Sequence, residues 1–132
     1  MRAIDTNVIV RFLVADDPAQ TRRVKKLMLD AVEYQGSLFV GISTVLESVW
    51  VMQARYGFSS KDILDSFDHL LGMSVLVFES RDVVFRWVRT GLTCGIDIDD
   101  YLIGLLNLAG GCTHTLTFDK KAARSPVFSL LD

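Results

Sequence analysis

The chain has 132 residues, 50% of them hydrophobic, with a formal net charge of −2 and a pI near 5.6. This length favours a single domain, which we expect to span residues 1–132, with enough apolar residues for a sizeable core. The slightly acidic balance argues against a simple nucleic-acid-binding module, because such modules are usually basic. It argues less against a metal nuclease, since bound metal ions bring positive charge to the site.

The sequence lacks the signals of secretion, zinc binding or membrane insertion. Cys94 and Cys112 form no Cys-x-x-Cys pair, and His69 and His114 have no partner at zinc spacing, so we interpret the cysteines as reduced thiols. No signal-peptide core opens the chain, and no apolar stretch reaches the roughly 18 residues that span a membrane. We therefore expect a cytoplasmic protein without a membrane partner.

Short apolar runs alternate with segments whose apolar residues recur at helical spacing. In chain order, the expected elements of the first half are a strand at Arg2–Ile4, helices at Asn7–Val14 and from Asp16-Asp17-Pro18 to about Gln35, a strand at Leu38–Ile42 and a helix at Ser43–Tyr56. Those of the second half are a helix from Ser59-Ser60 to Leu71, a strand at Ser74–Phe78, helices at Arg81–Leu92 and from about Asp99 to Ala109, and a strand at Thr113–Thr117. This alternation predicts an α/β fold with a mostly parallel sheet covered on both faces.

Helical spacing also predicts which side chains face the core. The helix at Ser43–Tyr56 is expected to bury Val45, Leu46, Val49, Trp50 and Met52. In the helix that begins at Pro18, Val32 is expected on the apolar face, while the basic residues of Arg22–Lys26 lie on the opposite, solvated face.

Four acidic residues, Asp5, Glu47, Asp100 and Asp119, each follow an apolar run or open the helix after one. In a parallel sheet these handover points lie along one edge, at the carboxyl ends of the strands, where ligand crevices form. Converging carboxylates repel each other unless hard cations lie between them or their pKa values rise. The joint pattern therefore predicts a divalent-metal site that acts on phosphate.

Each acid also has a purely structural interpretation. Asp5 can cap the helix that follows it, and Glu47 lies three residues after Thr44, the spacing of a capping box. Asp119 can be a turn residue. The segment Asp97-Ile98-Asp99-Asp100 is harder to explain in this way, because one helix start needs only one capping acid.

Carboxylates suit this chemistry because Mg²⁺ and Mn²⁺ prefer oxygen ligands. Two such ions roughly 3.5–4 Å apart can bind both the attacking water and the leaving oxygen of a phosphodiester. A Gly-rich phosphate loop is not needed, and Gly110-Gly111 lacks the Lys-Ser/Thr that would complete one.

Three segments of the chain resemble the motifs of PIN-domain ribonucleases. Ile4-Asp5-Thr6-Asn7-Val8 resembles their opening motif, Asp97 to Ile103 resembles their Asp-x-x-Asp-Ala-Leu-Ile segment, and Leu116-Thr117-Phe118-Asp119-Lys120 resembles their closing Thr-Phe-Asp motif. With Glu47 between them, and in a chain of this size, the three motifs look like VapC-type toxins of bacterial toxin–antitoxin pairs.

The resemblance implies a PIN-like three-layer α/β/α fold with four to five mostly parallel strands, and Mg²⁺- or Mn²⁺-dependent cleavage of RNA. It assigns metal ligation to Asp5, Asp100 and Asp119, and catalysis through a metal-bound water to Glu47. The auxiliary positions that it implies are the extra acid Asp97 and the orienting polar residues Thr6, Asn7 and Thr117. Asp99 departs from the family pattern, which has a small apolar residue there, so either Asp97 or Asp99 assists Asp100. Tyr101 replaces a common alanine and narrows the expected pocket.

The resemblance also implies partners, namely an RNA substrate, a small cognate antitoxin protein and a second copy of the chain in a homodimer. For the RNA backbone, the sequence offers basic residues in Arg22–Lys26, in Arg81–Arg89 and from Lys120 to Arg124. Lys120 and Lys121 are favoured because they directly follow Asp119. A solvated turn explains the same two lysines without RNA.

Two other functions fit parts of the sequence. An aspartyl-phosphate phosphatase or phosphotransferase would use Asp5 as its nucleophile, but such enzymes usually place a second acid two residues later, where this chain has Asn7. A non-catalytic RNA- or protein-binding domain with a degenerate site is the other alternative, against which the complete set of four acids argues.

Overall fold

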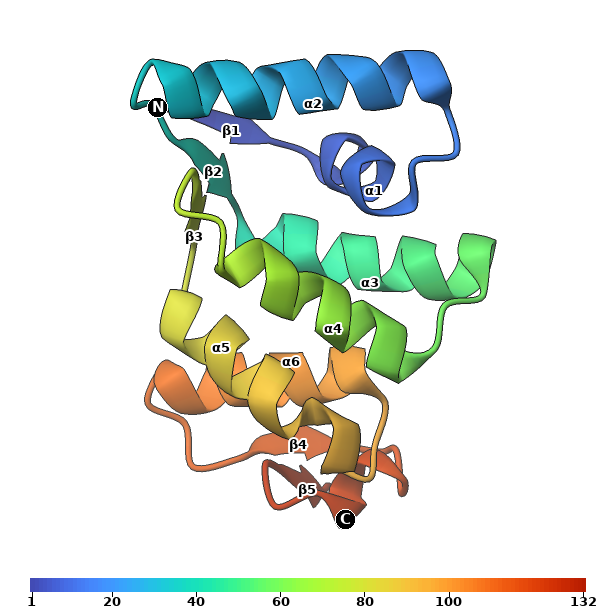
Figure 1. Ribbon diagram of the computed structural model, residues 1–132. Coiled ribbons are helices and arrows are strands. Elements are labelled where there is room, and N and C mark those ends of the chain that lie inside the picture. Colours follow the sequence, from blue (N-terminus) through green and yellow to red (C-terminus); the bar gives the residue numbers. More distant parts are fainter.

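A computed structural model describes residues 1–132 of the chain (Figure 1). The helices are α1 (Thr6–Val14), α2 (Pro18–Glu33), α3 (Ile42–Tyr56), α4 (Ser60–Leu71), α5 (Arg81–Thr90) and α6 (Ile98–Ala109), with short 3₁₀ turns η1 (Gly91–Thr93) and η2 (Ala122–Arg124). The strands are β1 (Arg2–Ile4), β2 (Leu38–Val40), β3 (Leu76–Phe78), β4 (Thr115–Thr117) and β5 (Phe128–Leu130).

All strand pairs are parallel, which confirms the predicted α/β class. Strands β1, β2 and β3 form one sheet in that order, while β4 and β5 pair only with each other. The expectation of one sheet of four to five strands is therefore wrong in this detail, and β5 was not predicted at all. In Figure 1, α5 and α6 lie between the two sheets.

The packing of α6 gives the physical reason for this division. Gly104, in the middle of α6, brings the helix so close to β5 that an added Cβ would lie 2.6 Å from Val127 Cγ2 and 3.0 Å from Phe128 Cε2. The same helix contacts α3 and α5. Because α6 packs against β5 as well as these two helices, the β4–β5 pair lies below it, away from the three-stranded sheet.

Most helix starts follow the sequence signals. The side chain of Asp17 accepts a hydrogen bond from the backbone N–H of Gln20 with Pro18 in the first turn, and Ser59 caps α4 in the same way. Helix α3 ends at Gly57, whose φ of 64° is the left-handed conformation that glycine adopts without strain. These local signals fix where the chain passes from α1 into α2 and from α3 into α4.

The core is built from the apolar faces of the helices and the three-stranded sheet, with Trp87 and Phe67 packed edge to face at its centre. Val45, Val49 and Met52 are fully buried on α3, as predicted. Two residues expected to face the core do not, since Trp50 is 58% exposed and Val32 is 60% exposed. The buried faces of the two helices are formed by other apolar residues, and each of these side chains lies on the solvent side of its helix.

No helix combines the length and apolarity needed to cross a membrane. Cys94 and Cys112 are both free thiols.

Candidate metal centre

Three carboxylates meet at the start of α6. The oxygens of Asp97, Asp99 and Asp100 lie within 4.8 Å of one another. Asp97 occupies the N-cap position without capping the helix through its side chain, and Asp99 accepts a hydrogen bond from the backbone N–H of Asp100 at 2.9 Å. The helix N-terminus partly stabilises this charge through its dipole, which favours anions in the first turn.

Asp100 shows the electrostatic signature of a crowded acid. Burial raises the pKa of its carboxyl above the usual value, and the charges of Asp99, Asp97 and Asp119 raise it further, while Lys121 acts in the opposite direction. Asp99 has a stronger effect than Asp97. The carboxylate of Asp100 makes no hydrogen bond to the protein, so both of its oxygens are available to a ligand.

Asp119 joins this group from the loop after β4. Its Oδ1 accepts hydrogen bonds from the backbone N–H groups of Lys121 at 2.8 Å and Ala122 at 3.3 Å, and its own N–H donates to Thr117 Oγ1 at 3.0 Å. The turn interpretation of Asp119 is therefore confirmed, and Thr117 holds the backbone of the acid. Since Oδ1 is occupied by the turn, the second oxygen, Oδ2, remains free for a cation.

A lysine ammonium also lies in this group. Lys121 Nζ forms an ion pair with Asp97 Oδ1 at 2.9 Å, with both side chains more than half exposed. Lys120 is exposed and forms no ion pair. Lys120 and Lys121 are equally favoured by the sequence, but their contacts differ, because only Lys121 forms an ion pair with one of the acids.

Asp5 and Glu47 form a second group around Thr6. Asp5 caps α1 by accepting from the N–H of Val8 at 3.1 Å. The buried Thr6 donates its hydroxyl proton to Glu47 Oε2 at 2.9 Å, which ties α1 to α3. The capping-box interpretation of Glu47 is wrong, because α3 begins at Ile42 and Thr44 already lies inside the helix.

A fifth acid at a strand end, Glu79, serves the fold instead. Glu79 follows β3, and its Oε2 accepts a hydrogen bond from the backbone N–H of Ile42 at 3.0 Å. This contact satisfies the N-terminus of α3, whose N-cap residue Gly41 has no side chain to do so. The carboxylate is therefore committed to the start of the helix that carries Glu47.

The two acidic groups lie on different elements and no hydrogen bond joins them. Asp5 and Glu47 are not among the charges that shift the pKa of Asp100, nor are they members of the cluster at α6. Helix α3, which carries Glu47, contacts both α1 and α6 and so connects the two groups. The prediction that all four acids share one site stays a prediction.

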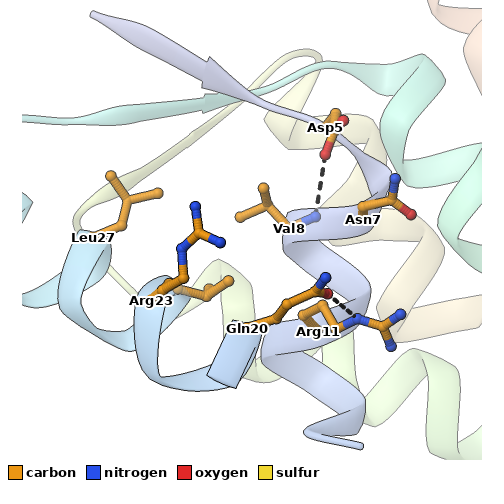
Figure 2. Close-up of a pocket in the computed structure, with 8 residues that line it drawn as sticks. Asp5, Asn7, Val8, Arg11, Gln20, Arg23 and Leu27 are labelled. Atoms are coloured by element: carbon orange, nitrogen blue, oxygen red, sulfur yellow. Dashed lines mark hydrogen bonds between the residues drawn. The ribbon is translucent and has the colours of Figure 1, made fainter. Parts of the chain in front are cut away.

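Sequence reasoning missed a groove of about 450 Å³ beside Asp5, between α1 and α2 (Figure 2). The side chains that α2 contributes to it are Gln20, Arg23, Val24 and Leu27, and those from the start and body of α1 are Asn7, Val8 and Arg11. Because the four α2 residues are spaced as neighbours on one helical face, the periodicity of α2 in the sequence already indicated that these side chains lie together. Asn7 lines the groove and makes no side-chain hydrogen bond, and its expected role in orienting the acids stays a prediction.

The donor set at α6 fits a hard divalent ion, because it offers carboxylate oxygens without competing nitrogen or sulfur ligands. No curated protein matches the chain. The family model described as PIN domain matches residues 3–126. PIN domains are generally nucleases that use divalent metal ions, which agrees with the acids found at α6. Because the match spans nearly the whole sequence, the chain belongs to the PIN domain family.

Proposed function

We propose that the protein is a Mg²⁺- or Mn²⁺-dependent endoribonuclease whose site contains Asp5, Glu47, Asp100 and Asp119. The observation that carries the proposal is the cluster at the start of α6, where three carboxylates lie within 4.8 Å of each other and Asp100 keeps two free oxygens. Membership of a family of metal-dependent nucleases supports the same chemistry.

In this proposal the α6 cluster supplies the main anchor for a cation. Asp100 and the free Oδ2 of Asp119 would hold the ion, with Asp99 as the assisting acid because Asp97 is paired with Lys121. A divalent ion bound there would offset phosphate charge and make a bound water a better nucleophile.

The second acidic group has a separate role in the proposed site. Metal ions of a two-ion site lie roughly 3.5–4 Å apart, so the acids that serve them need not touch each other. Asp5 keeps one oxygen beyond its bond to Val8, and the hydroxyl of Thr6 orients Glu47. We assign Asp5 to metal ligation and Glu47 to catalysis as a general base.

The experiment is incubation of total RNA with the purified protein, with and without Mg²⁺, followed by mapping of new 5′ ends. Asp100→Asn and Asp5→Asn are compared with Asp82→Asn, which changes an exposed acid in the first turn of α5. We expect the first two variants to lose cleavage and the third to keep it. Full activity of Asp100→Asn would refute the proposal, whereas full activity of Asp5→Asn alone would confine the site to the α6 cluster.

We also propose that the protein is the toxin of a VapBC-type pair, acting as a homodimer and neutralised by a small antitoxin. Support comes from the three motifs in their sequence order and from the exposed acids, which would attract a basic segment of a partner. Expression in bacteria should arrest growth for the parent but not for Asp100→Asn. If cells that express active parent protein grow normally, the proposed toxin role is refuted, while the proposed nuclease activity stands.

A further inference from the structure

We propose that the groove between α1 and α2 binds one nucleotide of single-stranded RNA next to the bond that is cleaved, with Arg23 holding its phosphate. The inference rests on the proposed function, because it places an RNA chain at Asp5. It goes further by assigning a substrate-binding subsite to residues outside the acidic groups.

The size and floor of the groove suit a nucleotide. Its volume is about 450 Å³, within the range of small-molecule sites. Val8, Val24 and Leu27 supply an apolar floor, on which the face of a base can lie. Figure 2 labels two of them, Val8 on α1 and Leu27 on α2. Enzymes that take a base out of its stack hold it between aromatic or apolar side chains.

The cations of the groove differ in their availability. Arg11 is held in place and its charge is paired, since its Nη1 donates to Asp16 and to Tyr56 Oη at 3.1 Å and its Nε donates to Gln20 Oε1 at 2.6 Å. Arg23 forms no hydrogen bond or ion pair and, in Figure 2, extends along the groove between the two helices. A guanidinium can bind a phosphate through two parallel hydrogen bonds. Arg23 therefore has the unpaired guanidinium of this groove, with all of its donors available to a phosphate.

One amide side chain beside the apolar floor can contact the edge of a base. Gln20 accepts from Arg11 through its oxygen, which leaves its NH₂ group as a donor. Asn7 makes no side-chain hydrogen bond, but in Figure 2 it lies on the opposite side of Val8 from Arg23 and Leu27. Gln20 therefore offers the base-edge hydrogen bond, whereas phosphate contacts alone carry no sequence information.

The groove is continuous with the proposed site through Asp5, whose carboxylate lies at one end of it. Because Arg11 pairs with Asp16, the unpaired charges of the lining are those of Asp5 and Arg23. A phosphate is therefore attracted to the Arg23 end of the groove, away from Asp5. An acidic peptide would meet the same arginine, but the apolar floor beside the NH₂ group of Gln20 favours a nucleotide.

The test measures binding separately from cleavage. Full-length Asp100→Asn protein is titrated into a labelled single-stranded RNA octamer of mixed sequence in Mg²⁺, and fluorescence anisotropy is recorded from 50 to 200 mM salt. Arg23→Ala is added to this background, with Arg22→Ala as the matched control. Arg22 is the neighbouring exposed arginine on α2 and does not line the groove.

We expect Arg23→Ala to weaken RNA binding about five- to ten-fold and to reduce the slope of log affinity against log salt by about 0.7, the loss of one phosphate contact. Arg22→Ala should change affinity by less than about two-fold. In the active protein, Arg23→Ala should raise KM with little change in kcat.

The inference would be overturned if Arg23→Ala and Arg22→Ala changed RNA affinity equally, or if neither changed it. This holds even if Arg23→Ala weakens the binding of an acidic peptide. If the parent protein nevertheless cleaves RNA in Mg²⁺, such a negative binding result refutes only the subsite and not the proposed function. A parent that neither binds nor cleaves RNA would overturn the subsite and the proposed function together.

Discussion

Replacing Asp100 by asparagine should make the metal-free protein more stable. Asp100 has a raised pKa because it is partly buried and faces the charges of Asp99 and Asp97. Asparagine has almost the same shape and removes one of the repelling charges. The variant therefore tests whether the acids at α6 are held together against their mutual repulsion, as a site prepared for a cation would be.

The magnitude follows from the spacing of the oxygens. Two unit charges about 5 Å apart repel by about 0.8 kcal/mol in water and by about 3 kcal/mol at an effective dielectric of 20. Because Asp100 is only partly buried, the lower figure applies, so its two neighbours in the cluster contribute about 1.5 kcal/mol together. Loss of the favourable interaction with the helix N-terminus removes about 0.5 kcal/mol. The net gain of about 1 kcal/mol corresponds to a rise of about 3–5 °C in Tm.

The assay is thermal unfolding in EDTA at low salt, followed by circular dichroism, for the parent and Asp100→Asn. The folded-state pKa of Asp100 is raised, so the charged form destabilises the folded protein. Below pH 3.8, the ordinary pKa of the Asp100 carboxyl, this group is uncharged in both the folded and the unfolded parent, so charge repulsion does not contribute to the difference in Tm. The Tm advantage of the asparagine variant should grow as the pH rises through the folded-state pKa of Asp100.

Three controls accompany this measurement. Asp82→Asn changes a first-turn acid outside the cluster, and should leave Tm unchanged or slightly lower. Added salt should shrink the advantage of Asp100→Asn, because ions screen the repulsion. Added Mn²⁺ should raise the Tm of the parent more than that of the variant. An unchanged or lower Tm for Asp100→Asn at pH 7 in EDTA would refute the electrostatic reasoning.

Three further changes follow from contacts at the site and beneath it. Lys121→Gln should lower the Tm in EDTA and tighten Mn²⁺ binding in calorimetry, since it removes the ammonium paired with the acids, while Lys120→Gln should do neither. Gly104→Ala should destabilise the fold by about 1–2 kcal/mol in urea unfolding, because its methyl group overlaps Val127. An unchanged urea midpoint would show that Val127 and β5 move to make room for the methyl group without cost. Thr6→Val should reduce RNA cleavage without unfolding the protein, and Thr6→Ser should restore it, because only the hydroxyl orients Glu47.

Local signals in the sequence predicted most elements well. The caps at Asp17 and Ser59, and the alternation of apolar runs, gave helices and strands close to those observed. Such features depend on contacts within a few residues, which is why a single sequence can reveal them. Strand β5 lacks this support, since it is three residues long and follows a 3₁₀ turn.

Long-range packing was less accessible. Nothing near Trp50 in the sequence shows that this side of α3 faces solvent, and the pairing of β4 with β5 alone depends on how closely α6 approaches Val127. The acids illustrate the same limit. The sequence correctly placed Asp97, Asp99 and Asp100 together, because they are neighbours on one helix start, whereas Glu47 finds its partner Thr6 far away in the chain.

The double use of the aspartates at positions 5 and 119 has a genetic consequence. Each spends one oxygen on backbone amides, a task that the side-chain oxygen of asparagine performs equally well. Codons for the two amino acids differ by a single base. In the proposed site, one point mutation at either position should thus remove a metal ligand while the backbone contacts of the residue, and with them the fold, are kept.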